Sequence, residues 1–170
     1  MVANIRSGAT PGGALRYNKE KVDKDEAEVL FWQRMLEPFD KHGRMDVDAC
    51  MDSFWPYLEA NRRTTNTVFH ASLNPSPEDR LTDDQLRDIA QEYMERMGYG
   101  NQPYIVFKHK DISREHLHIV SLRVDEKGLN YHTISKPVVL RKLPAIWNIS
   151  ITSIRRSKVR NRGTPPIFGK

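Results

Sequence analysis

Three of the six histidines in this 170-residue chain lie within ten residues of one another, at His109, His116 and His118. Side chains alternate between the two faces of a β-strand, so His116 and His118 share a face while Leu117 points to the other. A hairpin over this segment would place His109 opposite His116, with Cβ atoms roughly 5 Å apart. The spacing therefore predicts three imidazoles that converge on one metal ion.

The ligand type indicates what this metal would do. Three neutral imidazoles leave coordination positions open for water or a substrate oxygen, which is typical of catalytic rather than structural sites. Asp111 follows His109 by two residues and is expected to orient a ligand imidazole or to act as a general base. Ordinary surface histidines on a hairpin are the alternative. His70 lies on another predicted strand and is interpreted as a hydrogen-bonded core or groove histidine outside the ligand set.

The hydrophobic pattern predicts the strands that carry these residues. Val29, Phe31 and Gln33 are expected to share one side of their strand. Residues 103–109 and 115–124 read as an antiparallel hairpin because a short polar segment joins them. The other strands are expected over residues 2–7, 26–36, 68–73 and 129–134.

Helices are predicted over residues 14–22, 46–61 and 82–97, with Pro56 expected to kink or split the second. Thr82 and Gln85 have the spacing of a capping box at the start of the third. The element order predicts an α+β fold, in which an antiparallel or mixed sheet of about five strands carries helices mainly on one face.

Composition narrows the class of protein. Hydrophobic residues make up 38% and charged residues 29%, so the chain can bury a core and is not a disordered sequence. Cys50 is the only cysteine, which excludes an internal disulfide and Cys-rich zinc sites. There is no apolar run of roughly 18 residues and no secretory signal, so a cytoplasmic protein without membrane insertion is expected.

The basic residues are unevenly distributed. Residues 127–170 contain ten Lys or Arg and no Asp or Glu, while the first 126 residues contain 17 basic and 22 acidic residues. A basic tail on such a domain indicates a polyanionic partner, most simply nucleic acid, with a solvated extension as the equally weighted alternative. Residues 1–135 are expected to form the main domain, and residues 136–170 a basic segment that is partly packed or loose.

Two further motifs accompany the histidines. The pattern of His109, Asp111, His116 and His118 resembles the metal motif of the HUH endonucleases. The stretches GALRYN at residues 13–18 and ASLNPSPED at residues 71–79 resemble the relaxases, the mobilisation nucleases of plasmids and mobilisable elements, especially those of Bacteroides-type bacteria. The resemblance covers roughly residues 1–128 and implies an HUH endonuclease-like fold.

The resemblance implies a strand-specific and site-specific nick in DNA at an origin of transfer. In relaxases a tyrosine near the N-terminus attacks the phosphodiester and leaves a 5′-phosphotyrosyl link and a free 3′-OH, a role that falls here on Tyr17. The implied metal is Mg²⁺ or Mn²⁺, and other transition metals can occupy an imidazole site. Arg16, Lys19 and Lys21 flank Tyr17 and are expected to contact DNA phosphates.

The implied partners are single-stranded or supercoiled DNA at the origin of transfer, mobilisation accessory proteins and a coupling protein, in the bacterial cytoplasm. Three alternatives stay open. A rolling-circle replication initiator shares the triad, but its tyrosine typically follows the metal motif, where Tyr131 is the only candidate. A non-catalytic module would bind single-stranded DNA without cutting it. A zinc hydrolase would use the same histidines on a small substrate.

Overall fold

The computed structural model describes residues 1–76, 78–131 and 150–153. Nine helices and strands lie in these ranges and agree with most of the predicted elements. In chain order they are β1 (Val2–Gly8), α1 (Pro11–Asp23), β2 (Ala27–Gln33), α2 (Val47–Ala60), β3 (Val68–Asn74), α3 (Asp83–Arg96), β4 (Tyr104–His109), β5 (His116–Leu122) and β6 (Ser150–Ser153).

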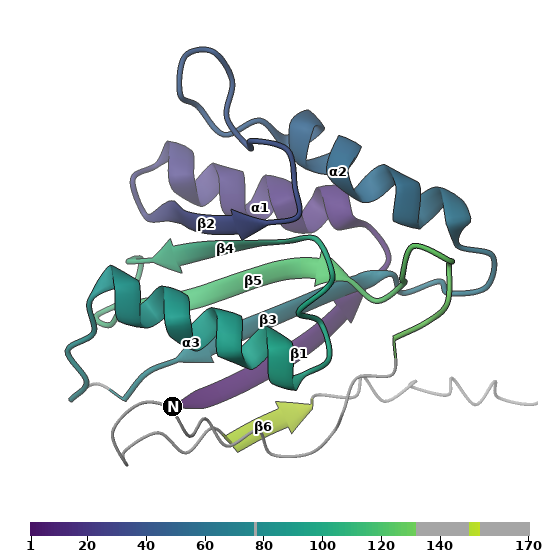
Figure 1. Cartoon of the computed structure of the whole chain (residues 1–170). Coiled ribbons are helices and arrows are strands. Elements are labelled where there is room, and N and C mark those ends of the chain that lie inside the picture. Colours follow the sequence, from purple (N-terminus) through teal and green to yellow (C-terminus); the bar gives the residue numbers. More distant parts are fainter. Residues whose placement is uncertain (77, 132–149, 154–170) are drawn as a thin grey trace, which may run out of the picture.

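The strands form one sheet in the order β2-β4-β5-β3-β1-β6 (Figure 1). The first five are antiparallel to their neighbours, while β6 pairs in parallel with β1. The predicted α+β class and the β4–β5 hairpin are confirmed. Of the expected basic segment, residues 136–170, the structure describes only β6.

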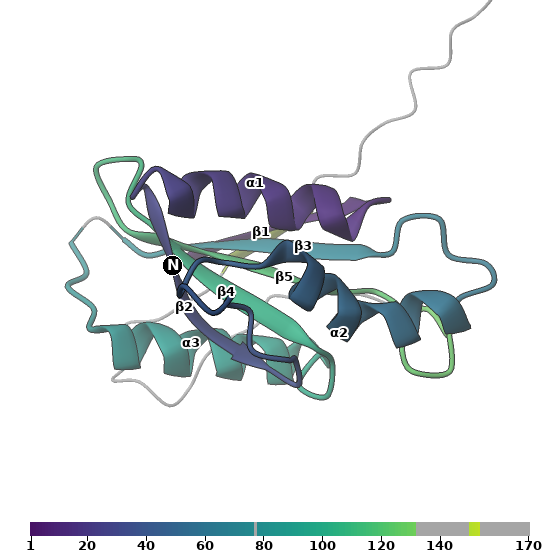
Figure 2. The same ribbon diagram turned by 90° about the horizontal axis from the view of Figure 1, so that it is seen from above.

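The helices lie on both faces of the sheet, and Figure 2 shows α1 and α3 on opposite sides. Leu15 of α1 and Phe54 of α2 pack in one core cluster with Phe107 of β4, whereas α3 packs in a second cluster with Val106. The expectation of helices mainly on one face holds for α1 and α2 but not for α3. Every residue of β4 is buried, and a central strand that is apolar on both sides needs cover on both faces.

A β-bulge changes the predicted facing of β2. Val29 pairs with Phe107, and Phe31 pairs with the adjacent Val106, so Leu30 is an extra residue in the ladder. Val29 therefore packs in the cluster of α1 and α2, and Phe31 in that of α3. The prediction that Val29, Phe31 and Gln33 share one side was wrong, because strict alternation fails at a bulge.

The helix boundaries follow local sequence signals. α1 begins at Pro11, three residues before the predicted start, because proline suits the first helical position, where no N–H is needed. α2 continues through Pro56 without a split. The capping box of α3 is present, with both the Thr82 and the Gln85 hydrogen bonds.

The remaining predicted strand is not confirmed. At residues 129–131 the structure has only an isolated bridge between Val124 and Asn130, and residues 132–134 lie outside the described ranges. In the described part of the chain, the helices are too short or too polar to span a bilayer.

The turn at residues 125–128 packs tightly against the end of α2. Gly128 has a φ of 74°, and a Cβ there would overlap the backbone oxygen of Ala60. Gly43 has the same φ, but among the described residues no atom lies within 4 Å of its Cβ position. We expect Gly43→Ala to lower the free energy of unfolding by about 1–2 kcal/mol from backbone strain alone. Gly128→Ala should cost about 2 kcal/mol more, because backbone atoms must move.

Urea denaturation of the two variants and the wild type measures this difference. Equal losses for the two glycines would contradict the close packing of this turn on α2.

Candidate metal centre and active site

The three histidines of the motif come together where β4 ends and β5 begins. The register pairs His109 directly with His116, as the spacing predicted, and His118 lies two residues further along the same face. One nitrogen from each ring lies within 4.8 Å of the other two. The centroid of the His109 ring is 4.1 Å from that of His118 and 5.3 Å from that of His116. The three imidazoles of this His triad are gathered closely enough that they could hold a single metal ion.

Asn18 determines which nitrogen of His109 is available. The Asn18 Oδ1 lies 2.7 Å from His109 Nε2, and the Asn18 Nδ2 donates to the carbonyl of Ala14 at 2.8 Å. The amide is thereby oriented with its oxygen toward the imidazole, so His109 Nε2 carries the proton and donates it. His109 Nδ1 is buried and has no hydrogen-bond partner among the described residues. Nδ1 therefore keeps a free lone pair that can bind a metal ion. A buried nitrogen of this kind, without a partner in the protein, is evidence that the residues fit a divalent ion.

The other two histidines are oriented from outside the triad in a similar way. His118 Nδ1 lies 2.9 Å from His70 Nε2, and His116 Nδ1 lies 3.4 Å from the carbonyl of Arg114. Each contact occupies Nδ1 and leaves Nε2 for a metal. His70 is therefore a hydrogen-bonded groove histidine, as the sequence indicated, and it orients a member of the triad.

Asp111 faces the triad from its open side. Its Oδ1 lies 4.0 Å from His109 Nδ1 and 3.8 Å from His116 Nε2, which are the two nitrogens left for the metal. These distances are too long for hydrogen bonds. Asp111 Oδ2 pairs with Lys21 Nζ at 3.0 Å, and this charge contributes to the lowered pKa of Asp111. In this geometry Asn18, rather than Asp111, orients the His109 ring.

Burial keeps the His109 and His118 imidazoles neutral. It lowers the pKa of His109 to about 4 and that of His118 to about 2, with the neighbouring histidines adding to both shifts. Burial, with a smaller contribution from Arg6 on β1, also lowers the pKa of His70 to about 4. Neutral imidazoles are the form that binds metal, so at neutral pH neither His109 nor His118 has to lose a proton before an ion enters.

Tyr17 lies on α1 directly before Asn18 and borders the same site. Its ring centroid is 6.3 Å from that of His109, with the planes 21° apart, and 6.2 Å from that of His118. The side chain is 45% exposed, so a macromolecular substrate can reach it. One turn of α1 therefore supplies two groups to the triad: the phenol of Tyr17 and the Asn18 amide that orients His109.

The three basic residues around Tyr17 differ in what they contact. Arg16 is exposed. Lys19 pairs with Asp23 at 2.6 Å, and Lys21 pairs with Glu26 at 2.7 Å as well as with Asp111. Hydrogen bonds to these two carboxylates raise the pKa of Lys21. Arg16 is therefore the member of this group that can bind a phosphate without giving up an ion pair.

The sequence interpretation missed Asn18, although a signal for it exists. Leu15, Asn18 and Val22 follow the helical spacing of a buried stripe, and Asn18 is its only polar member. A polar residue in such a stripe must find a partner inside the protein.

Replacing Asn18 tests its role toward the triad. Asn18→Leu removes the acceptor at similar volume, so His109 loses its fixed tautomer, and we expect a loss of roughly 10–100-fold in Mn²⁺ or Co²⁺ affinity. Asn18→Asp keeps an acceptor oxygen and should stay much closer to the wild type. Titration calorimetry and the visible absorption of bound Co²⁺ measure both.

Asn61→Leu is the matched control, because Asn61 also bonds backbone groups but lies at the C-terminal end of α2. A folded Asn18→Leu protein with unchanged metal affinity would show that Asn18 has no role in preparing His109.

The lowered pKa values also predict a pH dependence of stability. His70 and His109 take up protons near pH 4 when folded but near pH 6.5 when unfolded, so the unfolded state binds more protons between these values. In EDTA, the free energy of unfolding should be highest above about pH 6.5 and fall toward pH 4, by up to about 1.4 kcal/mol per pH unit for each such histidine.

Urea denaturation across this pH range measures the slope. His70→Gln should reduce the slope of the free energy of unfolding against pH by up to about 1.4 kcal/mol per pH unit, the contribution of one proton. A slope equal to that of the wild type would contradict a lowered pKa at His70.

Comparison with known proteins agrees with this geometry. Residues 17–145 match the family model described as "Relaxase: MobA/VirD2-like, nuclease domain". The match begins at Tyr17, includes the whole His triad and covers about three-quarters of the chain. No curated protein and no solved structure matches the chain. The resemblance seen in the sequence is thus confirmed, and the chain belongs to the relaxase family through a MobA/VirD2-like nuclease domain that acts on DNA.

Proposed function

We propose that this protein nicks one DNA strand at an origin of transfer, with Tyr17 as the nucleophile and His109, His116 and His118 as ligands of a divalent metal. The observation that carries the proposal is the position of the Tyr17 ring beside the His109 and His118 rings, on an exposed part of the site. The family model supports DNA as the substrate. Mg²⁺ or Mn²⁺ is the proposed ion.

The proposed reaction is a transesterification. The Tyr17 oxygen attacks the scissile phosphorus, the bond from phosphorus to the 3′ oxygen breaks, and the proton lost by the phenol ends on that 3′ oxygen. The products are a 5′-phosphotyrosyl link and a free 3′-OH, so no oxidant or water is consumed. A bound metal supplies Lewis acidity toward the phosphate oxygens.

The protein's own residues prepare this step. Asn18 holds His109 in the tautomer that leaves Nδ1 as the ligand nitrogen, and His70 contacts Nδ1 of His118, so that Nε2 of His118 is the nitrogen left toward the site. Lys21 keeps the Asp111 carboxylate ionised beside the triad, where it is placed to accept a proton or to bind a water. Arg16, next to Tyr17, is the proposed contact for a phosphate flanking the cut, and Lys19 and Lys21 would contact DNA only if they exchanged their present partners.

The position of Tyr131 argues against a replication initiator, in which the nucleophilic tyrosine follows the metal motif in the chain. Its ring lies 5.2 Å from that of Tyr99 and packs against the core cluster of α3, on the face of the sheet opposite the triad. Tyr131 would have to leave this contact to reach the metal centre. The geometry therefore supports the N-terminal Tyr17 as the nucleophile.

The further partners that we propose are mobilisation accessory proteins and a coupling protein, in the bacterial cytoplasm.

A covalent-adduct assay tests the nucleophile. The protein is incubated with Mn²⁺ and labelled single-stranded oligonucleotides that tile the candidate transfer origins of its own genetic element. We expect an adduct that survives a denaturing gel, requires metal and disappears in Tyr17→Phe, because only the phenol oxygen can form the ester. Tyr131→Phe is the matched control and should keep the adduct.

The loss of the adduct in Tyr17→Phe identifies the nucleophile only if this variant still binds metal and DNA as the wild type does. An adduct that persists in Tyr17→Phe would refute Tyr17 as the nucleophile. Tight, salt-sensitive binding without any adduct, on oligonucleotides that cover the whole element, would favour the non-catalytic binding module.

A further inference from the structure

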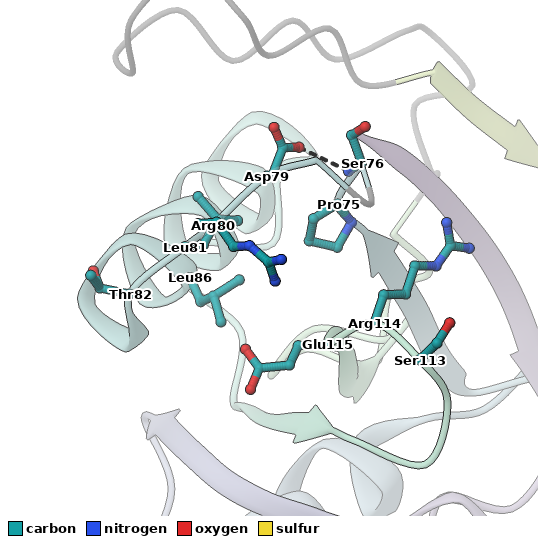
Figure 3. A pocket seen from close by; sticks show the side chains of 10 residues that line it. All are labelled: Pro75, Ser76, Asp79, Arg80, Leu81, Thr82, Leu86, Ser113, Arg114 and Glu115. Atoms are coloured by element: carbon teal, nitrogen blue, oxygen red, sulfur yellow. Dashed lines mark hydrogen bonds between the residues drawn. The ribbon is translucent and has the colours of Figure 1, made fainter.

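A cavity lies beside the hairpin that carries the triad. It has a volume of about 450 Å³, in the range of small-molecule sites, and opens between the β3–α3 connection and the β4–β5 connection (Figure 3). Pro75, Leu81 and Leu86 contribute apolar surface to its wall. We refer to it as the hairpin pocket.

The hairpin pocket and the triad share one loop. Residues 110–115 join β4 to β5, with Asp111 facing the histidines near the start of the loop and Arg114 and Glu115 lining the pocket at its end. Glu115 directly precedes His116, and the carbonyl of Arg114 is the group next to His116 Nδ1. Leu86 belongs to the core cluster of α3, so the pocket lies on the α3 side of the sheet, and a DNA strand with a phosphate at the triad reaches it by passing around the β4–β5 connection.

Two opposite charges face each other across the hairpin pocket without pairing. Figure 3 shows the Arg80 guanidinium and the Glu115 carboxylate pointing into the cavity from opposite walls. Among the described residues neither side chain forms a hydrogen bond or an ion pair. Asp79, in contrast, already accepts a hydrogen bond from the Ser76 N–H at 2.8 Å. The pocket thus offers a set of donors on one wall and two acceptor oxygens on the other.

This pattern matches the edge of one DNA base. Guanine presents two adjacent donors, N1–H and N2–H, to a carboxylate and keeps O6 and N7 as acceptors for a guanidinium. Thymine has a single ring N–H, adenine has no carbonyl oxygen, and cytosine has its donors on one amino nitrogen, so none of them offers two adjacent N–H groups to a carboxylate. The apolar wall suits the face of a planar base, and the cavity is large enough for a nucleotide.

We propose that the hairpin pocket binds a guanine of the DNA strand that passes from the triad around the β4–β5 connection, with Glu115 as the acceptor for N1–H and N2–H and Arg80 as the donor to O6 or N7. The pocket then contributes to the choice of nicking sequence. This assignment rests on the proposed nicking function for its biological role, while the binding itself can be measured without metal or cleavage.

The direct test is an NMR titration of the full-length, isotope-labelled protein in EDTA with each of the four deoxynucleoside monophosphates. We expect dGMP to shift the signals of residues 75–86 and 113–115 and to bind about tenfold or more tightly than dTMP. Glu115→Gln should remove this preference, and Glu126→Gln, an exposed change in the 125–128 turn, should leave it unchanged. Equal binding of all four nucleotides, or a preference that survives Glu115→Gln, would overturn the proposal.

A second arm separates DNA from free nucleotides as the source of the base. A short oligothymidylate with one central guanine should bind more tightly than the all-thymine strand, and Glu115→Gln should abolish the gain. If dGMP binds but the single guanine adds nothing, the assignment to DNA is wrong. Because both arms use metal-free protein, they give the same result in Tyr17→Phe, so failure of the nicking proposal and failure of this one can be told apart.

Discussion

The pairing register of β4 with β5 is the constraint on which the site depends. It sets His109 opposite His116 and places His118 on the same face. A slip of one residue would turn His116 and His118 to the other side of the sheet, because side chains alternate with a period of two. The register is held by apolar residues that alternate between two cores, with Phe107 and Val120 facing α1 and α2 and Val106 and Ile119 facing α3. The same packing that stabilises the fold thus positions the ligands.

Burial gives the triad its chemistry and also creates a need for partners outside it. An imidazole in this environment stays neutral and can bind metal, yet each ring has a second nitrogen that must be satisfied. Asn18 meets this need for His109, and His70 does so for His118. Asn18 therefore selects the tautomer of His109, which presents Nδ1 to the site, while the contact with His70 lies at Nδ1 of His118 and leaves its Nε2 on the side of the triad.

Helix α1 connects the nucleophile to this arrangement. Tyr17 and Asn18 are consecutive, so one points over the triad toward solvent while the other is buried against His109. Any movement of α1 that displaces the phenol also disturbs the hydrogen bond that orients His109. On the opposite side, the β4–β5 connection links the triad to the hairpin pocket through Arg114 and Glu115. The site is thus supported by one helix and one loop that meet at the end of β4.

The sequence alone determined most of the elements, the α+β class and the family, because these depend on local periodicity, turn signals and short motifs. It also predicted that His109, His116 and His118 meet, since a hairpin with a short connection leaves few registers. It did not reveal the bulge at Leu30, the cover of α3 on the second face or the hydrogen bond from His109 to Asn18. These depend on contacts between residues far apart in the chain, such as the 91 positions that separate Asn18 from His109, and only the packed structure brings such groups together.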